Sequence, residues 1–328
     1  MLQNNIGGLS NNLNEGKKMP EFGTERMVDI DLISSLIYDI TKFGMEKADY
    51  IGKMDYHKIL YLLRKKLDDD NRVKKSLQFY WYRYGPYSTL IEGSIKDLER
   101  ENVLASSEES KGEGFVLEEE YDHGYDETDY ETALDEIVFI LEDYDLFADR
   151  DKILKNKIYI YAPYKFQKFY KFELIPKVKS LKDGSLLSIR GYGDDELIKL
   201  LSFAEAKLPL DERFEDFNKV FSRFVTDSNL FFKKIDNEFY EDGLEIFCDI
   251  STEIWNVFCK RLRTVEYDPY YERKVDNWID MYKKSLAALI EKIDEFELFI
   301  DENMEVSGDV KVSSDSAWGV VAKDIIEN

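Results

Sequence analysis

Few side chains in this sequence have the types and spacing that catalysis requires. The chain has two histidines, His57 and His123, and neither lies near a cysteine in the sequence. The two cysteines, Cys248 and Cys259, are 11 positions apart, which places them on nearly one face of a helix. We therefore expect two buried structural thiols rather than a redox pair, and no metal site.

Calcium-binding and phosphate-binding patterns are also incomplete. Asp143-Tyr144-Asp145 lacks the glycine and the terminal glutamate of an EF-hand loop. Gly191-Tyr192-Gly193 is followed by Asp194 and Asp195, whose charges would repel a phosphate at a helix N-terminus. Neither a Gly-x-Ser-x-Gly elbow nor the lysine of a phosphate-binding loop is present. The sequence thus predicts a protein that is not an enzyme and that uses no cofactor.

Positive charge is concentrated in one stretch of an otherwise acidic chain. The net charge of −23 argues against a protein whose whole surface coats nucleic acid or an anionic membrane. Between residues 51 and 100, however, 11 bases accompany seven acids. We predict that DNA or a partner protein contacts the basic residues of this stretch, which are Lys65, Lys66, Arg72, Lys74, Lys75 and Arg83. Alternatively, they neutralise the chain's own acidic segment, residues 101–150, which has 18 acids and two bases.

The elements that position these residues are organised around the aromatic stretch Phe79–Ser88. Its aromatic side chains favour a short strand over 79–84. Gly85-Pro86 then breaks the strand, because proline fixes φ, lacks an N–H and pushes the residue before it out of the helical region. Ser88 or Thr89 can cap a following helix, and Thr89 and Glu92 have capping-box spacing. A helix should therefore begin directly after the turn.

The flanks of this stretch complete a module. Apolar residues at helical spacing predict helices over 29–43, over 55–67 with Asp55 as its cap and Lys58 on its polar side, and over 89–100. Residues 103–106 and 114–117 have the composition of two strands joined by a polar loop. Helix, strand, tight turn, helix and β-wing is the order of a winged helix.

The rest of the chain is mostly helical by pattern. Apolar residues at helical spacing predict helices over 131–143, 210–224, 244–262 and 270–300. In the first of these the predicted buried stripe is Leu134, Ile137, Val138 and Leu141, and the next one begins its apolar face at Leu210. Residues 157–161 and 169–174 have strand-like composition and predict a small β element.

These patterns predict a mainly α protein with small β content (α+β), in which an N-terminal winged-helix-like domain precedes a helical bundle-like C-terminal domain. We expect a disordered leader over 1–27, the winged-helix-like domain over 28–120, an acidic loop over 121–130, a mostly helical domain over 131–300 and a tail over 301–328. The absence of a signal peptide, of a transmembrane-length apolar run and of a disulfide framework predicts a cytoplasmic protein without a membrane partner.

One part of the chain resembles a known family. A helix that contains Lys58-Ile59-Leu60-Tyr61, followed by Tyr84-Gly85-Pro86 and Ser88, resembles the Panacea antitoxin domain and related winged-helix-like proteins of prokaryotes. The resemblance covers residues 30–120, and its motif residues are Lys58, Leu60, Tyr61, Tyr84, Gly85, Pro86 and Ser88. It implies a non-enzymatic regulatory module of the kind that neutralises a toxin encoded beside it.

Three hypotheses of function follow. The first is an antitoxin-like regulator that uses a winged-helix scaffold and an acidic surface to engage a basic, toxin-like protein partner, since opposite charges speed association. The alternative is a transcriptional regulator that binds DNA through the basic residues, although its predicted reading helix carries Glu92, Asp97 and Glu99 against two bases. A third, DNA mimicry by residues 107–149, depends on charge alone.

Overall fold

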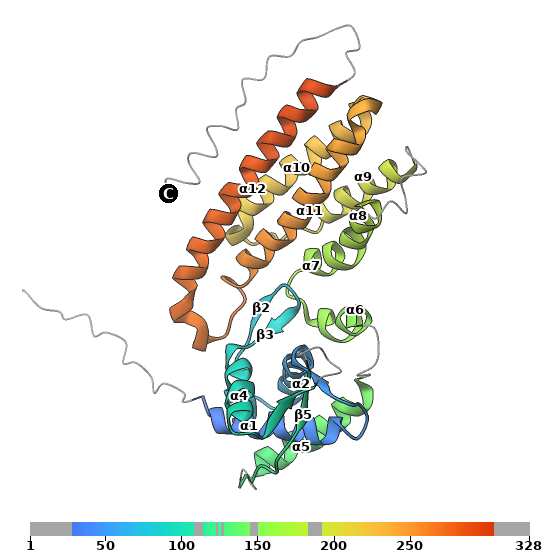
Figure 1. Cartoon of the computed structure of the whole chain (residues 1–328). Coiled ribbons are helices and arrows are strands. Elements are labelled where there is room, and N and C mark those ends of the chain that lie inside the picture. Colours follow the sequence, from blue (N-terminus) through green and yellow to red (C-terminus); the bar gives the residue numbers. More distant parts are fainter. Residues whose placement is uncertain are drawn as a thin grey trace, which may run out of the picture.

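The computed structural model describes residues 28–107, 114–122, 124–125, 128–144, 150–182 and 192–304. The described part is mainly helical with a small sheet content, as the sequence predicted. The predicted leader and residues 305–328 of the predicted tail lie outside the described residues. Figure 1 shows the N-terminal elements at one end of the molecule and the long C-terminal helices at the other.

The N-terminal part combines short helices with two small sheets. Its elements are α1 (Ile30–Gly44), β1 (Ile51–Gly52), α2 (Lys53–Lys66), α3 (Arg72–Ser76), β2 (Tyr80–Tyr82), β3 (Gly85–Tyr87), α4 (Thr89–Arg100), β4 (Leu104–Ser106), β5 (Gly114–Leu117) and α5 (Thr128–Asp143). One antiparallel sheet has the order β1-β5-β4, and β2 pairs with β3 as a separate hairpin. The two predicted wing segments therefore pair, with Ala105 opposite Val116.

Two details of the predicted helices were wrong. Helix α2 begins at Lys53, with Gly52 rather than Asp55 at its N-cap. Lys58 is buried and not on a polar side, because α2 is surrounded by α3, α5, β1 and β3. The short helix α3 was not predicted, and Asn71 caps it by accepting hydrogen bonds from the backbone N–H groups of residues 73 and 74.

The C-terminal part is built from helices. They are α6 (Arg150–Ile153), η1 (Leu154–Ile158), η2 (Tyr159–Tyr161), α7 (Lys165–Phe169), η3 (Tyr170–Leu174), α8 (Ile175–Lys182), α9 (Tyr192–Glu205), η4 (Glu212–Phe214), α10 (Glu215–Lys234), η5 (Asn237–Phe239), α11 (Tyr240–Leu262), η6 (Pro269–Lys274) and α12 (Val275–Asn303). Helices η1 and η3 are π-helical, whereas η2, η4, η5 and η6 are 3₁₀ helices.

The predicted β element at 157–161 and 169–174 is wrong, because both segments are helical. The aromatic content of these segments suggested strands, but the buried apolar residues between 166 and 181 recur at helical spacing: Phe166, Tyr170, Leu174, Val178 and Leu181. Steps of four residues exceed the period of 3.6 for an α-helix, and the wider π-helical turn η3 accommodates the excess. One face of the helix can therefore stay buried throughout.

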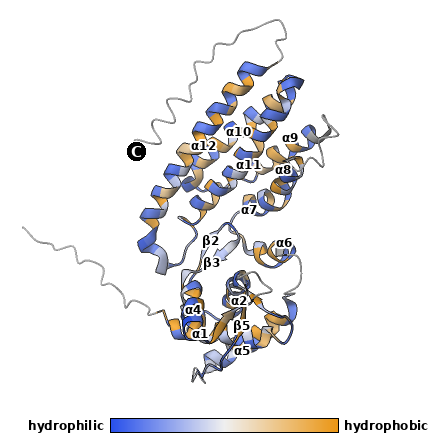
Figure 2. Cartoon of the chain, in the orientation of Figure 1, coloured by the Kyte–Doolittle hydropathy of each residue, from blue (hydrophilic) through white to orange (hydrophobic). Residues whose placement is uncertain are grey.

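The long helices α10, α11 and α12 form a bundle whose apolar faces point inward (Figure 2). Phe217, Phe221 and Phe224 of α10 are fully buried, as their spacing predicted. Leu210 is fully exposed, because it precedes the first turn of the helix and is not on its apolar face. The two cysteines are buried free thiols on α11, as predicted.

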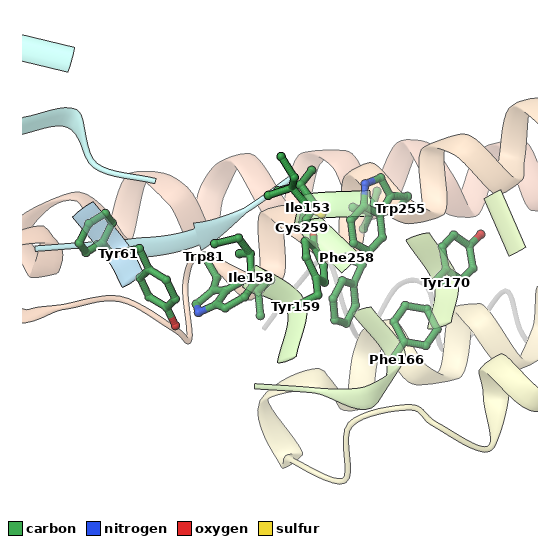
Figure 3. Packing of buried hydrophobic residues seen from close by; sticks show 14 of the residues in the cluster. Tyr61, Trp81, Ile153, Ile158, Tyr159, Phe166, Tyr170, Trp255, Phe258 and Cys259 are labelled. Atoms are coloured by element: carbon green, nitrogen blue, oxygen red, sulfur yellow. The ribbon is translucent and has the colours of Figure 1, made fainter. Parts of the chain in front are cut away.

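One hydrophobic core runs through both parts of the chain (Figure 3). The ring centroids of Tyr61 and Trp81 are 6.0 Å apart, and those of Trp81 and Tyr159 are 5.6 Å apart. Closer to the bundle, the ring centroids of Phe166 on α7 and Phe258 on α11 are 4.7 Å apart. Buried residues of both parts belong to this one cluster, and Phe79 and Trp81 of the hairpin region lie within it.

Candidate functional site

A segment from the C-terminal part lies along the β2–β3 hairpin. The backbone N–H of Trp81 donates to the carbonyl oxygen of Glu266 (2.9 Å), and the N–H of Asp268 donates to the carbonyl oxygen of Phe79 (2.9 Å). Tyr80 and Tyr267 thereby form an antiparallel bridge. The segment around Tyr267 thus lies beside β2 as a third backbone segment. We name residues 79–89 and 264–274 together the junction.

A half-buried ion pair fixes this contact. The two carboxylate oxygens of Asp268 accept hydrogen bonds from the guanidinium of Arg64 at 2.5 and 2.8 Å. The same carboxylate accepts from the backbone N–H of Phe79 at 2.6 Å. Since bidentate charged hydrogen bonds are directional, Asp268 joins α2, the hairpin and the bundle in one geometry.

The N-terminal end of α4 is covered at the junction. Ser88 caps α4 by accepting from the backbone N–H of Leu90 at 3.3 Å, so that Thr89 is the first helical residue and not the cap. The Tyr271 hydroxyl lies 3.0 Å from the Ser88 hydroxyl and accepts from the backbone N–H of Thr89 at 3.0 Å. Lys274 donates to the Thr89 hydroxyl at 3.3 Å. The first turn of α4 therefore faces the bundle.

Aromatic rings fill the space behind this contact. The rings of Tyr80, Tyr271 and Trp278 form a small buried cluster, with Tyr80 4.8 Å from each of the other two centroids. Burial raises the pKa of Tyr80 well above its ordinary value, with the neighbouring Tyr271 as a further cause. The Arg263 guanidinium lies 5.2 Å from the ring of Tyr82. This cluster packs the junction with buried aromatic rings.

The residues that carry the Panacea resemblance meet beneath the hairpin. The ammonium of Lys58, although buried, donates to the carbonyl oxygen of Pro86 at 2.8 Å. Gly85 has a φ of +93°, and a side chain there would begin 3.1 Å from Ile158. The glycine is therefore required twice, by its backbone conformation and by the close packing. These contacts give the motif a structural role, since they hold α2 against the hairpin.

The other motif residues have the same role with one exception. Leu60 and Tyr61 are buried, and Tyr61 packs edge-on against Phe79 and Trp81. Tyr84, at the tip of the hairpin, is 54% exposed and lies under the ammonium of Lys171, 4.6 Å from its ring centroid. Of the motif, this ring alone is exposed to a partner.

His57, next to Lys58, is also buried. Its Nδ1 accepts a hydrogen bond from the backbone N–H of Ser88 at 3.2 Å, and its ring stacks on Tyr87 with the centroids 4.4 Å apart. Burial lowers the pKa of His57 well below its ordinary value, and the positive charge of Lys58 lowers it further. A neutral imidazole that supports the start of α4 has a structural role.

The predicted basic residues do not form one common surface, because some are paired with acids and one lies at the hairpin turn. Arg72 pairs with Asp29 at 2.7 Å, and Lys74 pairs with Asp69 at 2.7 Å. Arg83 lies apart from the others, at the hairpin turn, where it donates to the side-chain oxygen of Asn256 on α11. It therefore belongs to the junction and not to a common basic surface.

Lys65, Lys66 and Lys75 are exposed. The ammonium of Lys65 lies 5.2 Å from the ring of Tyr61, and partial burial lowers the pKa of this lysine, with nearby Arg64 as a second cause. That of Lys66 lies 4.9 Å from the ring of Phe139 on α5. These lysines are the part of the predicted basic surface that remains open to a partner.

An open pocket of about 700 Å³ lies at the N-terminal end of α1 and the side of α3. Its charged lining residues are Asp29, Asp31, Arg72 and Lys75. Because two acids balance two bases, the pocket has no net charge that would favour an anion or a cation.

The described residues contain neither a metal-binding cluster nor a membrane-spanning helix. In the ranges that the structure describes, histidine, cysteine and acidic side chains nowhere gather in a group that could hold a metal ion. No helix in those ranges combines the length and the apolar character needed to span a membrane.

Sequence reasoning missed the second half of the junction. Asp268 and Tyr271 contact residues that precede them by 182 to 204 positions. Such contacts leave no local period in the sequence, although the proline at 269 is typical of the first turn of a helix and marks where η6 begins.

Comparisons with models of protein families, with curated proteins and with solved structures find no match to this chain. The functional argument therefore depends on the geometry of the described residues.

Proposed function

We propose that this chain is a non-enzymatic, antitoxin-like regulatory protein that engages a protein partner. In this proposal residues 28–120 are a winged-helix-like scaffold, and the partner is basic. The order of α1, β1, α2, α3, α4 and the β4–β5 wing supports the scaffold, as does the sheet order β1-β5-β4. The sequence resemblance to the Panacea domain points to the same class.

The observation that carries the proposal is the covered end of α4. Proteins with a helix-turn-helix arrangement read DNA with the N-terminal residues of the helix that enters the major groove. In the corresponding helix of this chain those residues contact Tyr271 and Lys274 of η6, which leads into α12. Further along α4, Glu92 pairs with Lys53 at 2.7 Å and Asp97 pairs with Arg100. A buried reading end and paired charges favour a scaffold over a DNA reader.

The charge of the chain favours a basic partner. The excess of 23 negative charges attracts proteins of high isoelectric point and raises their rate of association at low salt. Capture experiments with the full-length chain in extracts of its native organism test this. We expect a basic protein in stoichiometric amount. Recovery of no partner above the level of an unrelated acidic bait would contradict the proposal.

The alternative, a DNA-binding transcriptional regulator, is favoured by the exposure of Lys65, Lys66 and Lys75. It is tested by binding to random-sequence duplex DNA at low salt, with the double variant Lys66→Glu, Lys75→Glu. The matched control is Lys233→Glu, Lys234→Glu, which changes the same charge at exposed positions near the end of α10. Salt-sensitive binding that only the first variant loses would favour the regulator, because phosphate contacts supply most of such affinity.

A further inference from the structure

The outward face of α5 differs from the predicted pattern at Val138, whereas Ile137 and Leu141 are buried as predicted. Val138, predicted to lie in the buried stripe, is 39% exposed, and its neighbour Phe139 is 55% exposed. The buried side chains of α5 are Tyr130, Ala133, Ile137, Ile140 and Leu141. The helix therefore has more apolar residues than its buried face can hold.

Acidic residues precede and follow the two exposed apolar side chains along α5, and they lie between these two side chains around the helix axis. Glu131, Asp135 and Glu142 are exposed, and with Val138 and Phe139 they occupy an arc of about 100° on the helix. These five residues are here named the α5 ridge. Among the described residues, neither a hydrogen bond nor an ion pair engages the three acidic side chains of the ridge.

The charge of α5 is not explained by the stability of the helix. Its sequence contains six acids and no base. Acids near the N-terminus are favourable there, but Glu142 and Asp143 lie in the last turn, where the helix dipole disfavours a carboxylate. Asp143 is compensated by an ion pair with Lys157, and Glu142 is not. A residue that costs helix stability without a local compensation points to a role outside the folded chain.

The ring of Phe139 already accommodates a cation. The ammonium of Lys66 lies 4.9 Å from its centroid, at a distance typical of a cation–π contact. A basic side chain of a partner can lie over the ring when it displaces the ammonium of Lys66, while its apolar neighbours cover Val138. The ridge is thus complementary to a segment with apolar residues at its centre and positive charges on either side.

We propose that the α5 ridge is the docking surface for an amphipathic basic helix of the partner protein. The proposal rests on the proposed function, since it specifies where that partner binds. Helix α5 lies at the end of the molecule that is far from the bundle (Figure 1). The exposed face of α12 is a weaker candidate, because Lys283, Lys284 and Lys292 interrupt its acidic residues.

The test measures binding of the full-length chain to a synthetic amphipathic peptide of about five helical turns, with leucine on one face and lysine and arginine on its flanks. Two variants remove the ridge: the triple variant Glu131→Gln, Asp135→Asn, Glu142→Gln, and the single variant Phe139→Ser. Two variants on α12 are the matched controls. The triple variant Asp280→Asn, Glu291→Gln, Glu295→Gln removes the same charge as the triple ridge variant. The single variant Leu298→Ser removes an apolar side chain that is 57% exposed, as Phe139→Ser does on the ridge.

We expect each ridge variant to weaken peptide binding about tenfold, the effect of roughly 1.4 kcal/mol of lost contact, and each control to leave it within about twofold. A peptide of the same composition with its apolar residues scattered around the helix should bind the parent no better than the ridge variants do. Equal weakening by ridge and control variants would mean that net charge alone attracts the peptide, and the proposal would be wrong.

Capture from the native organism separates the two proposals. If the parent captures a basic partner and the ridge variants capture it equally well, the docking surface is wrong and the proposed function stands. If the parent captures none, the proposed function fails as well. Loss of the captured partner in the ridge variants, but not in the α12 controls, supports both.

Discussion

Asp268 offers the sharpest test of the junction between the two parts of the chain. Replacing it with alanine removes the bidentate pair with Arg64 and leaves the backbone N–H of Phe79 without its acceptor. The side chains of Asp268 and Arg64 are only 17% and 25% exposed, so that water compensates for little of the loss. A charged hydrogen bond contributes about 1.5–3 kcal/mol, and an orphaned buried donor costs about 1–3 kcal/mol.

We therefore expect Asp268→Ala to lower the free energy of unfolding by about 3 kcal/mol. Asp268→Asn keeps one acceptor oxygen and should lose about half as much. The matched control is Glu215→Ala, which breaks an exposed pair between Glu215 and Lys219 and should cost far less, because water screens both charges. Urea denaturation gives these differences from the transition midpoints.

Hydrogen exchange gives the structural part of the same test. The backbone N–H of Trp81 donates to Glu266, two positions before Asp268, and it should exchange faster in Asp268→Ala than in the parent. If Asp268→Ala costs no more than Glu215→Ala and leaves exchange at Trp81 unchanged, the junction does not hold the two parts together and the argument is refuted.

Three further predictions concern single positions. Gly93→Ala on α4 should stabilise the protein by about 0.5–1 kcal/mol, because nothing lies within 4 Å of the new methyl group. Gly243→Ala on α11 should destabilise it by about 1–3 kcal/mol, because that methyl group would clash with the ring of Phe231. Urea denaturation of both variants checks the opposite signs. Burial raises the pKa of Asp227 to about 7, and the charge of Glu297 adds to the effect. Asp227 of the folded chain thus keeps a proton that the unfolded chain releases near the ordinary pKa of 3.8, so that the free energy of unfolding falls as the pH rises from about 4 to about 7. Asp227→Asn should remove that pH dependence and stabilise the protein by a few kcal/mol at pH 8. Denaturation series at several pH values check this. Ser88→Ala should lower the free energy of unfolding by about 1–2 kcal/mol, because it removes the cap of α4. If the loss is no larger than that of a serine-to-alanine change at an exposed position, the Ser88 hydroxyl does not have this role.

Local patterns were sufficient for most of the helices. The helix from Thr89 to Arg100 and the paired wing segments were predicted from capping, turn and apolar spacing, because those signals lie within a few residues of the structure that they specify. The same holds for Phe217, Phe221 and Phe224, whose spacing alone places them on one buried face. Segments with π-helical turns were mistaken for strands, because their period differs from the one that sequence patterns assume.

Functional surfaces were less predictable than elements. The sequence identified Lys58, Gly85 and Pro86 as a motif, but only the structure showed that the lysine is buried under the hairpin. Lys74 and Arg72 were candidates for partner contacts, yet acids near them in space take up their charges. Val138 was expected in the core and is exposed. The burial of a side chain depends on which helices and strands pack against its own element. The pairing of a charge depends on which side chains approach it in the folded chain. Neither can be read from local spacing.

The chain's composition and periodicity determined its acidic charge, its mainly helical class and the position of the aromatic turn. Each of these follows from residue types or from spacings of three to four positions, which act within one helical turn. Tertiary structure alone decided that residues 264–274 close over the hairpin and the start of α4, because contacts between residues nearly 200 positions apart leave no mark on local spacing. That closure covers the start of α4, and it is the observation on which we propose a scaffold over a DNA reader.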